Sequence, residues 1–234
     1  MEELLAHAKR PLPGLARECS DPVTGIIQMQ NRRAEKIQKS KFSDIANTAT
    51  ELVASNTPIS RELVKVSQNL LKSRVISMET WTQDWADPET PNQCLPSALS
   101  SDTRRLIRDQ ILEGCEILHE VTACREVGVR LAALHSMMCP RFHIDNLQCR
   151  LMITLSGEGT EWIPNQFVDW DMFYDLSDRR PPIKTGAKIE KMLSGYWYLL
   201  KGGAWEKDYP GIVHRSPDSD RRRLLLSLDP ILDR

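Results

Sequence analysis

The pattern of the sequence changes near Glu126, and this change constrains the fold more than any other feature. Six short apolar segments follow, separated by glycine, proline and other turn residues: VGVRLAALHS, FHIDNLQCRLMITL, TEWIP, GYWYLLKG, GIVHRS and RRLLLSLD. Short runs of this kind, bounded by turn signals, are typical of β-strands. Several in succession favour an antiparallel sandwich or barrel, which we expect over residues 123–234.

The preceding part of the chain, residues 1–122, is predicted to be mainly helical. The segment TPISRELVKVSQNLLKSR has Thr57 as a candidate N-cap and apolar residues at helical spacing, namely Ile59, Leu63, Val66 and Leu70. A second helix is predicted in SSDTRRLIRDQILEGCEILHEV, with Ser101 or Asp102 as its cap. The segment between them, WTQDWADPETPNQCLPS, contains three prolines and is expected to be an ordered loop.

Residues 1–25 are rich in proline, glycine and charge and are expected to form an irregular arm. The resulting prediction is an α+β protein in which N-terminal helices pack on a C-terminal sheet.

Charge and cysteine usage exclude several classes of partner. The chain has 31 basic and 32 acidic residues, so no global field attracts nucleic acid or an anionic membrane. The six cysteines are scattered, with no Cys-x-x-Cys, which fits a reducing cytoplasm. No apolar run approaches the roughly 18 residues of a membrane helix, and none resembles a signal peptide. We therefore expect a cytoplasmic protein with no nucleic-acid or membrane partner.

Three features of the strand-rich part could carry chemistry together. His143 and Asp145 are two positions apart, so a strand would point both side chains to the same side. His214 follows some 70 residues later, and the arginines at 221–223 lead into the last strand. Two imidazoles and one carboxylate can form a facial triad that holds divalent iron with three positions left open. An arginine on the next strand could bind a dicarboxylate co-substrate.

Each of these features also has a structural interpretation. A His-x-Asp pair arises readily by chance, a lone histidine is more often structural than a ligand, and three arginines are typical of a solvated turn. Strand alternation supports the metal site, because His143 and Asp145 would share a face with apolar residues: Leu147, Cys149, Leu151 and Ile153. A buried histidine and aspartate need partners, which a metal supplies.

Other residues are weaker candidates for the pocket. Arg150 has the opposite parity and would enter the pocket only if a bulge near Asn146 resets the register. Trp162, Tyr198 and Lys201 lie at the ends of candidate strands, where binding groups are often presented. For Trp162 and Tyr198, packing in the core or at its rim is the alternative.

Four blocks in the order CPRFHIDNLQCRLMITLSGEGTEWIP, YLLKGGAW, PGIVHRSP and RLLLSLD resemble a bacterial family known as domain of unknown function 1826. The resemblance covers roughly residues 100–234. The genes of that family are associated with zinc homeostasis, so the resemblance implies a connection to metals and a metal-homeostasis protein as a possible partner.

The order of His-x-Asp, Gly-Thr, His and then Arg on a closing strand is also similar to iron- and 2-oxoglutarate-dependent oxygenases. That resemblance implies a jelly-roll, cupin-like double-stranded β-helix with a metal site formed by His143, Asp145 and His214. It also implies that Arg223 binds the 2-oxoglutarate carboxylate, with Ser227 as a second donor and Arg222 as the alternative if the register shifts by one.

Two functions therefore follow from the sequence. The first is an Fe(II)/2-oxoglutarate-dependent oxygenase that acts on a small or amino-acid-like substrate. The second is a non-enzymatic accessory protein that binds zinc through the same three ligands. Zinc accepts histidine and carboxylate ligands as readily as iron does, so the residue types do not separate the two.

Overall fold

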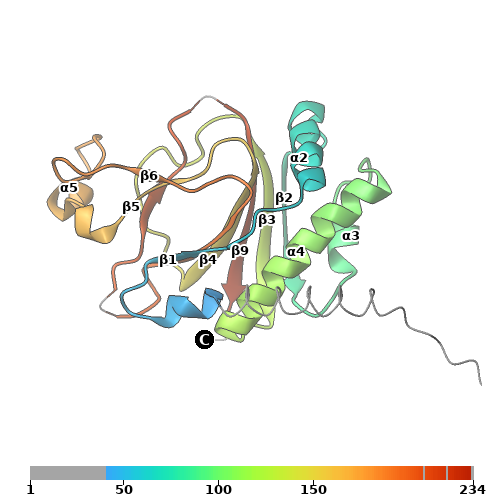
Figure 1. The fold of residues 1–234 in the computed structure, drawn as a ribbon, viewed down its shortest axis with the longest axis horizontal. Helices are drawn as coiled ribbons and strands as arrows, with labels where there is room; N and C mark the ends of the chain where they lie inside the picture. Colours follow the sequence, from blue (N-terminus) through green and yellow to red (C-terminus); the bar gives the residue numbers. More distant parts are fainter. Residues whose placement is uncertain (1–40, 208, 220, 233–234) are drawn as a thin grey trace, which may run out of the picture. The chain divides into compact units, whose positions relative to one another are not determined.

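Two antiparallel sheets form the framework of the protein in the computed structural model, which describes residues 41–207, 209–219 and 221–232 (Figure 1). All of these residues belong to one compact unit, residues 37–234. The expected irregular arm over residues 1–25 lies outside the described residues. The mixture of helices and antiparallel strands agrees with the α+β class predicted from the sequence.

Sheet A has six strands in the order β1-β7-β4-β9-β3-β2. These strands are β1 (Leu52–Ala54), β2 (Met78–Asp84), β3 (Glu126–Leu134), β4 (Cys149–Ser156), β7 (Trp197–Lys201) and β9 (Arg223–Ile231). Sheet B has three strands in the order β6-β5-β8, which are β5 (Glu161–Ile163), β6 (Glu190–Lys191) and β8 (Val213–Arg215). All of the pairings between these strands are antiparallel.

In the described part of the chain, two helices are long: α2 (Arg61–Ser73) and α4 (Ser101–Thr122). Their caps differ from the predicted ones, because the hydroxyl oxygen of Ser60 accepts from the Leu63 amide and that of Ser100 from the Thr103 amide. The other helical elements among the described residues are short: η1 (Ser43–Ala46), α3 (Thr90–Cys94), η2 (Asn165–Phe167) and α5 (Trp170–Tyr174).

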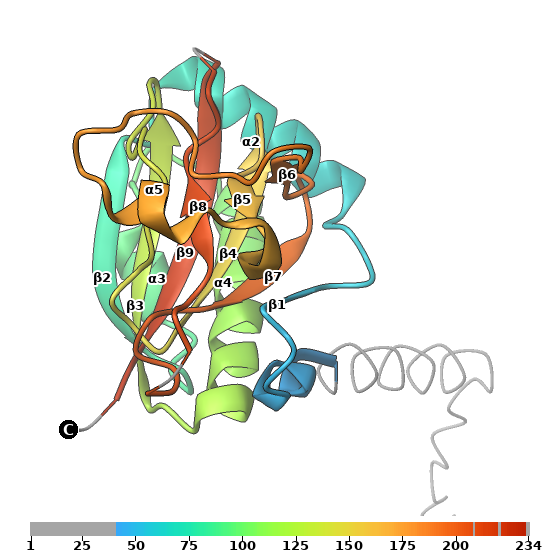
Figure 2. The ribbon, with the colours of Figure 1, turned by 90° about the vertical axis from the view of Figure 1, so that its left-hand side faces the viewer.

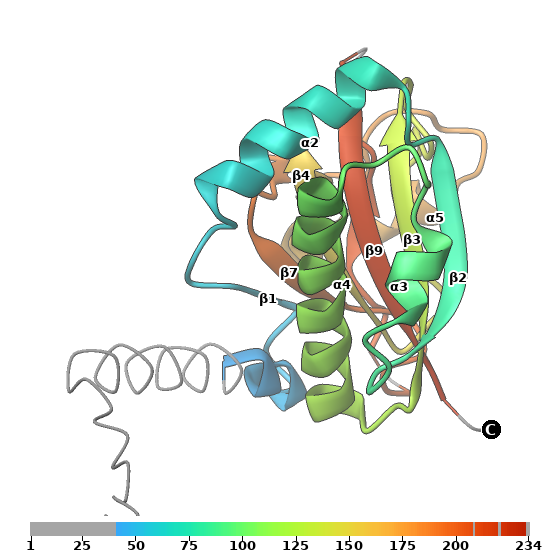
Figure 3. The ribbon, with the colours of Figure 1, turned by 90° about the vertical axis from the view of Figure 1, so that its right-hand side faces the viewer.

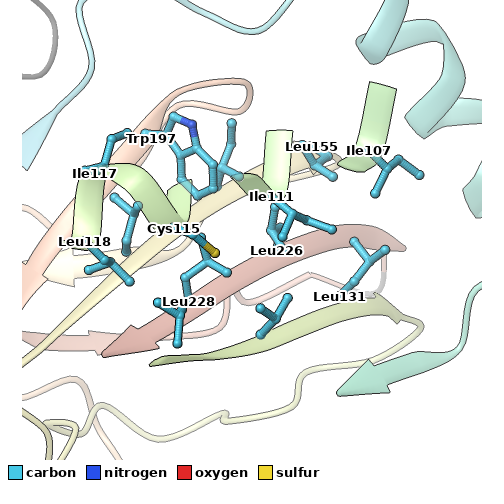
Figure 4. Packing of buried hydrophobic residues seen from close by; sticks show 14 of the residues in the cluster. Ile107, Ile111, Cys115, Ile117, Leu118, Leu131, Leu155, Trp197, Leu226 and Leu228 are labelled. Atoms are coloured by element: carbon cyan, nitrogen blue, oxygen red, sulfur yellow. The ribbon is translucent and has the colours of Figure 1, made fainter. Parts of the chain in front are cut away.

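Helix α4 packs its apolar stripe on one face of sheet A (Figures 3 and 4). The stripe consists of Ile107, Ile111, Cys115 and Leu118, all fully buried. Gly114 allows the close approach, since a Cβ there would lie only 2.2 Å from Leu228 Cδ1 and 2.8 Å from Trp197 Cη2. Helix α2 joins the same hydrophobic cluster through Leu63, Leu70 and Leu71. This face of sheet A is therefore the main core of the protein.

Part of the predicted loop around WTQDWADPETPNQCLPS is regular structure. Its first residues end strand β2, which pairs with β3, and Thr90–Cys94 form α3. Alternation explains the strand, because Trp81 packs against the core while its neighbours Thr80 and Thr82 point to the other face. The predicted boundary at residue 122 falls between α4 and β3, but strands from both sides of it share sheet A.

The predicted strand FHIDNLQCRLMITL is wrong at its start. Strand β4 begins only at Cys149, and His143 forms an isolated bridge instead. The chain between them is held against another loop, because Gly203 N donates to Asp145 O and Ala204 N to Leu147 O. A Cβ at Gly202 would lie 2.0 Å from Leu147 O, so glycine is required for this approach.

The other face of sheet A is directed toward sheet B (Figure 1). A second hydrophobic cluster lies between the two sheets. Sheet A contributes Ala132, Leu134, Met152, Tyr198, Leu200 and Leu225, and Met192 and Ile212 complete the cluster. Among the described residues, none of the helices is long and apolar enough to cross a membrane.

Candidate metal centre

His143, Asp145 and His214 converge between the two sheets. Each offers one ligand atom, and these atoms all lie within 4.8 Å of one another. His214 Nε2 is 3.3 Å from Asp145 Oδ2, and His143 Nε2 is 3.7 Å from Asp145 Oδ1. The structure therefore brings together the three residues that the sequence pattern grouped.

The backbone fixes the positions of both histidines. His143 N donates to His214 O and His214 N donates to His143 O, each over 3.0 Å. This antiparallel bridge places the two side chains on one face, with their ring centroids 4.6 Å apart. Asp145 follows two residues later, and its carbonyl is held by Gly203 N.

Hydrogen bonds also fix the tautomers of the two rings. Nδ1 of His143 lies 3.0 Å from the Arg141 carbonyl oxygen, and Nδ1 of His214 lies 3.1 Å from the Ile212 carbonyl oxygen. A carbonyl oxygen only accepts, so each Nδ1 carries hydrogen and each neutral ring presents the lone pair of Nε2. Two such lone pairs and the Asp145 carboxylate face one another. This arrangement is suited to a divalent cation, and the Nδ1 contacts are those expected of metal-ligating histidines.

The charge states favour cation binding near neutral pH. Burial raises the pKa of Asp145, but the neighbouring His214 and the charge of Arg150 outweigh this effect and lower it to about 2. Burial, followed by the neighbouring His214, lowers the pKa of His143. Asp145 is therefore ionised and His143 neutral, the states in which both can ligate a metal.

Arg150 links the candidate metal ligand to a second carboxylate. Its Nη1 donates to Asp145 Oδ2 over 2.7 Å, while Nε and Nη2 donate to the two Asp229 oxygens over 2.7 and 2.8 Å. Strand parity had placed Arg150 away from the pocket unless the register was reset. The register is reset, because residues 142–148 do not continue strand β4.

Arg223 is buried between the two sheets, whereas Arg221 and Arg222 are exposed. Its Nη1 donates to Thr160 Oγ1 over 3.2 Å and its Nη2 to Ser216 Oγ over 3.0 Å. Burial lowers its pKa to about 10. Within the described part of the chain, no carboxylate lies within ion-pair distance of this guanidinium. A buried cation that contacts only hydroxyl groups is suited to an anionic ligand.

The remaining predicted residues fall into two groups. Ser227 is buried on the inner face of β9, Trp162 pairs with His214 in sheet B, and the Tyr198 hydroxyl accepts from Leu193 N inside the second cluster. Lys201 has the opposite parity to Tyr198. Its Nζ donates to Asn47 O over 2.8 Å and lies near the rings of Trp205 and Tyr209, so the structure does not bring its side chain to the three ligands.

Sequence reasoning did not single out Thr160, Ser216 or Asp229 as site residues. Each lies within a quoted motif: Thr160 in SGEGT, Ser216 in PGIVHRSP and Asp229 in RLLLSLD. Each is two residues from a candidate on the same predicted strand, namely Trp162, His214 or Ser227, so strand alternation places it on the same face as that candidate. The strand pairings that make this parity meaningful are long-range and are not visible in the local sequence.

A sequence model of the family described as "Protein of unknown function (DUF1826)" matches residues 37–229. The chain belongs to the DUF1826 family. The match reaches further toward the N-terminus than the expected 100–234, and it includes both long helices as well as the strands of both sheets. A search of curated proteins finds no match.

The fold of this DUF1826 protein is similar to that of solved oxygenase structures. One is the dioxygenase for auxin oxidation 1 from Arabidopsis thaliana in complex with 2-oxoglutarate, at 13% identity and a TM-score of 0.52, covering 86% of this chain and 90% of that one. Another is a prolyl-4-hydroxylase from Pseudomonas putida, at 11% identity and a TM-score of 0.46, covering 82% and 93%. The first of these similarities supports the predicted oxygenase-like jelly-roll fold.

Proposed function

We propose that this protein is a non-haem Fe(II)/2-oxoglutarate-dependent oxygenase that acts on a small or amino-acid-like substrate. One observation carries the proposal: the three convergent ligands share the inter-sheet space with Arg223, a buried arginine that contacts only hydroxyl groups. The similarity in fold to a dioxygenase solved with 2-oxoglutarate supports the same assignment.

The donor set fits iron. His143 and His214 would supply neutral imidazole nitrogens and Asp145 a carboxylate, which is the two-histidine, one-carboxylate set of non-haem iron oxygenases. Iron bound there would supply the redox chemistry with oxygen, which no side chain provides. Arg150 holds the Asp145 carboxylate through one of its oxygens, and Asp229 holds Arg150 in turn. The two arginine contacts therefore orient a ligand before any metal binds.

Arg223 fits one carboxylate of 2-oxoglutarate. Its acceptor Ser216 lies two residues beyond His214, on the order of 7 Å along an extended chain. A five-carbon diacid could therefore reach from the ligands to the guanidinium. Thr160, which Arg223 also contacts, and Ser227, on the same face of β9, are the proposed hydroxyl partners of that carboxylate.

The rest of the inter-sheet space would exclude water and orient the substrate. Trp162 lies beside His214 across the β5–β8 pair, and Tyr198 lies within the apolar cluster that faces sheet B. We assign both to the substrate side of the pocket, together with Arg150. Such aromatic walls would suit a small substrate.

The test is spectroscopic. Protein purified without a chelating tag is analysed for metals, and ferrous iron followed by 2-oxoglutarate is then added under anaerobic conditions. We expect a visible charge-transfer band at a stoichiometry of about one 2-oxoglutarate per chain. His214→Ala should lack the band, while Arg222→Ala should keep it because that side chain is exposed.

The competing outcome is equally specific. Tight stoichiometric zinc, with no 2-oxoglutarate binding to the iron-loaded protein, would replace the oxygenase with the zinc-binding accessory protein. A role in zinc homeostasis and a partner in metal homeostasis are predictions of the family resemblance alone.

A further inference from the structure

A separate cavity of about 330 Å³ opens beside α5. Its walls come from the segment before His143, from the stretch between α5 and Pro182, and from strand β8. In Figure 1, α5 lies beyond sheet B on the side away from sheet A, and Figure 2 shows it in front of β8. The cavity is lined in part by Arg141, Phe142, Phe173, Arg179, Pro182 and Arg215.

This cavity and the candidate metal centre lie on opposite faces of the same two chain segments. His143 and His214 point between the sheets, so their neighbours Phe142 and Arg215 point to the outer face. The Arg215 guanidinium lies over the Phe142 ring, 4.5 Å from its centroid. A ligand in this cavity would therefore not occupy the proposed oxygenase pocket.

The floor of the cavity is apolar. Phe142 and Pro182 are buried, and Met172 and Phe173 are half-buried. Phe142 also belongs to a third hydrophobic cluster, against which Phe173 and Trp170 pack. These side chains offer a preformed surface to a flat or aromatic group.

The rim is positively charged, although the whole chain has a formal net charge of −1. Four arginines line the cavity against one aspartate, Asp178. Arg180 is paired with Asp178 and Arg215 with Glu161. The other two, Arg141 and Arg179, have no carboxylate within ion-pair distance among the described residues.

Arg141 differs from Arg179 in its contacts. Arg141 donates to the backbone oxygens of Asp175 and Leu176, each over 2.9 Å, which fixes its guanidinium at the rim without neutralising its charge. Arg179 is exposed, and the described residues show no hydrogen bond from its side chain. The apolar floor is therefore flanked by the Arg141 guanidinium, which the backbone holds in place, and by the exposed Arg179 guanidinium.

We propose that this cavity binds a small organic anion with an aromatic body and one carboxylate or sulfonate group. The aromatic body would lie against Phe142 and Phe173, and the anionic group would pair with Arg141 and Arg179. Arginine suits this role because its planar guanidinium makes bidentate contacts with such oxyanions. The proposal does not depend on metal or 2-oxoglutarate binding.

The test compares an anionic probe with a neutral one of similar shape. Binding of 8-anilinonaphthalene-1-sulfonate and of N-phenyl-1-naphthylamine to the full chain is followed by fluorescence. We expect one sulfonate probe per chain, and at least threefold weaker binding to Arg179→Glu because an attractive charge becomes repulsive. The affinity of the neutral probe for Arg179→Glu should differ less than twofold from its affinity for wild type. Arg61→Glu, an exposed arginine on α2, is the matched control and should leave both probes unaffected.

A second variant tests the floor. Phe173→Ala should weaken the binding of both probes, because it removes a ring that the aromatic part of either probe would contact. The proposal is overturned if the sulfonate probe binds Arg179→Glu as tightly as Arg61→Glu, if the neutral probe loses as much affinity as the anionic one, or if wild-type protein binds neither. Arg179 is exposed, so its substitution leaves the fold intact, and unchanged thermal unfolding would verify this.

Discussion

Strand β9 has two faces with different compositions. Toward the helices it presents Leu224, Leu226 and Leu228, which belong to the main core. Toward sheet B it presents Arg223, Leu225, Ser227 and Asp229, three of them polar. One strand thus supplies both the packing that stabilises the fold and the polar groups of the candidate site.

This division rests on the two-residue period of a strand. A shift of one residue in the pairing of β9 with β3 and β4 would move the leucines into the inter-sheet space and turn Arg223 toward the helix-covered face of sheet A. The packing of Leu228 against Gly114 opposes such a shift. The helix-facing side therefore fixes the register on which the candidate site depends, and substitutions on the two faces should have separable effects.

The largest effect is expected at the site itself. His214→Ala removes one of three convergent ligands and should weaken metal binding by more than about 100-fold, beyond the 10–100-fold typical of residues that only support a ligand. Metal content and titration of the apo-protein with ferrous iron measure this loss. Retention of wild-type affinity would show that the triad is not the metal site.

Leu228→Ala should have the opposite profile. It leaves a cavity beside Gly114 and Trp197 and should lower the free energy of unfolding by about 2–5 kcal/mol. Denaturant titration measures this change. Metal affinity per folded molecule should stay near wild type, and a matching loss of metal affinity would mean that the two faces of β9 are not independent.

Arg223→Ala should separate the co-substrate from the metal. We expect 2-oxoglutarate to bind at least about tenfold more weakly than it binds wild type, because a charge-assisted contact contributes about 1.5–3 kcal/mol. The metal content should stay near wild type. Arg223→Lys should recover only part of the affinity, since lysine lacks the planar fork. Isothermal titration of the metal-loaded protein provides the measurement. Unchanged 2-oxoglutarate affinity in Arg223→Ala would remove the arginine from the proposed pocket.

Asp229→Asn should have a smaller effect on the metal. The substitution keeps the size of the side chain but weakens the bidentate contact that positions Arg150 on Asp145, so metal affinity should fall by about tenfold. Asp84→Asn is the control, because Asp84 pairs with an exposed arginine far from the ligands in sequence. Equal metal affinities in the two variants would contradict a supporting role for Asp229.

A pH dependence is also expected for the stability of the metal-free protein. The pKa of Asp145 is about 2 in the folded state and about 3.9 in an unfolded chain, so its ionisation stabilises the fold above about pH 4. This contribution, at most about 2–3 kcal/mol, is lost as the pH falls toward 2. Denaturant titrations between pH 5 and 2.5 should show a steeper loss for wild type than for Asp145→Asn. The loss of unfolding free energy in Leu228→Ala relative to wild type should not vary with pH over this window.

The sequence predicted those parts of the molecule that depend on local periodicity. The apolar spacing through Ile107, Ile111, Cys115 and Leu118 predicts α4, and the short apolar run of RRLLLSLD predicts the central part of β9. Arg223 shares strand parity with Ser227, and the structure buries Arg223 while Arg222 is exposed. These patterns are local consequences of helix and strand geometry.

The sequence failed where distant backbone segments decide the conformation. The prolines that follow residues 81–84 dominate the local pattern and predict a loop there, whereas pairing with β3 makes these residues the end of strand β2. His143 and Asp145 were placed on a continuous strand because the contact of Leu147 with Gly202 is not visible locally. The link from Asp145 through Arg150 to Asp229 was missed for the same reason.

The reciprocal backbone bridge between His143 and His214 joins positions that are 71 residues apart in the chain. A cation shared by the two side chains would therefore act as a removable cross-link around a long loop that contains β4, β5 and β7. A permanent link around a loop of this length restricts the unfolded chain by about 4 kcal/mol. Metal supply would then control the stability of this whole segment, and the lifetime of the folded protein would follow the availability of its metal.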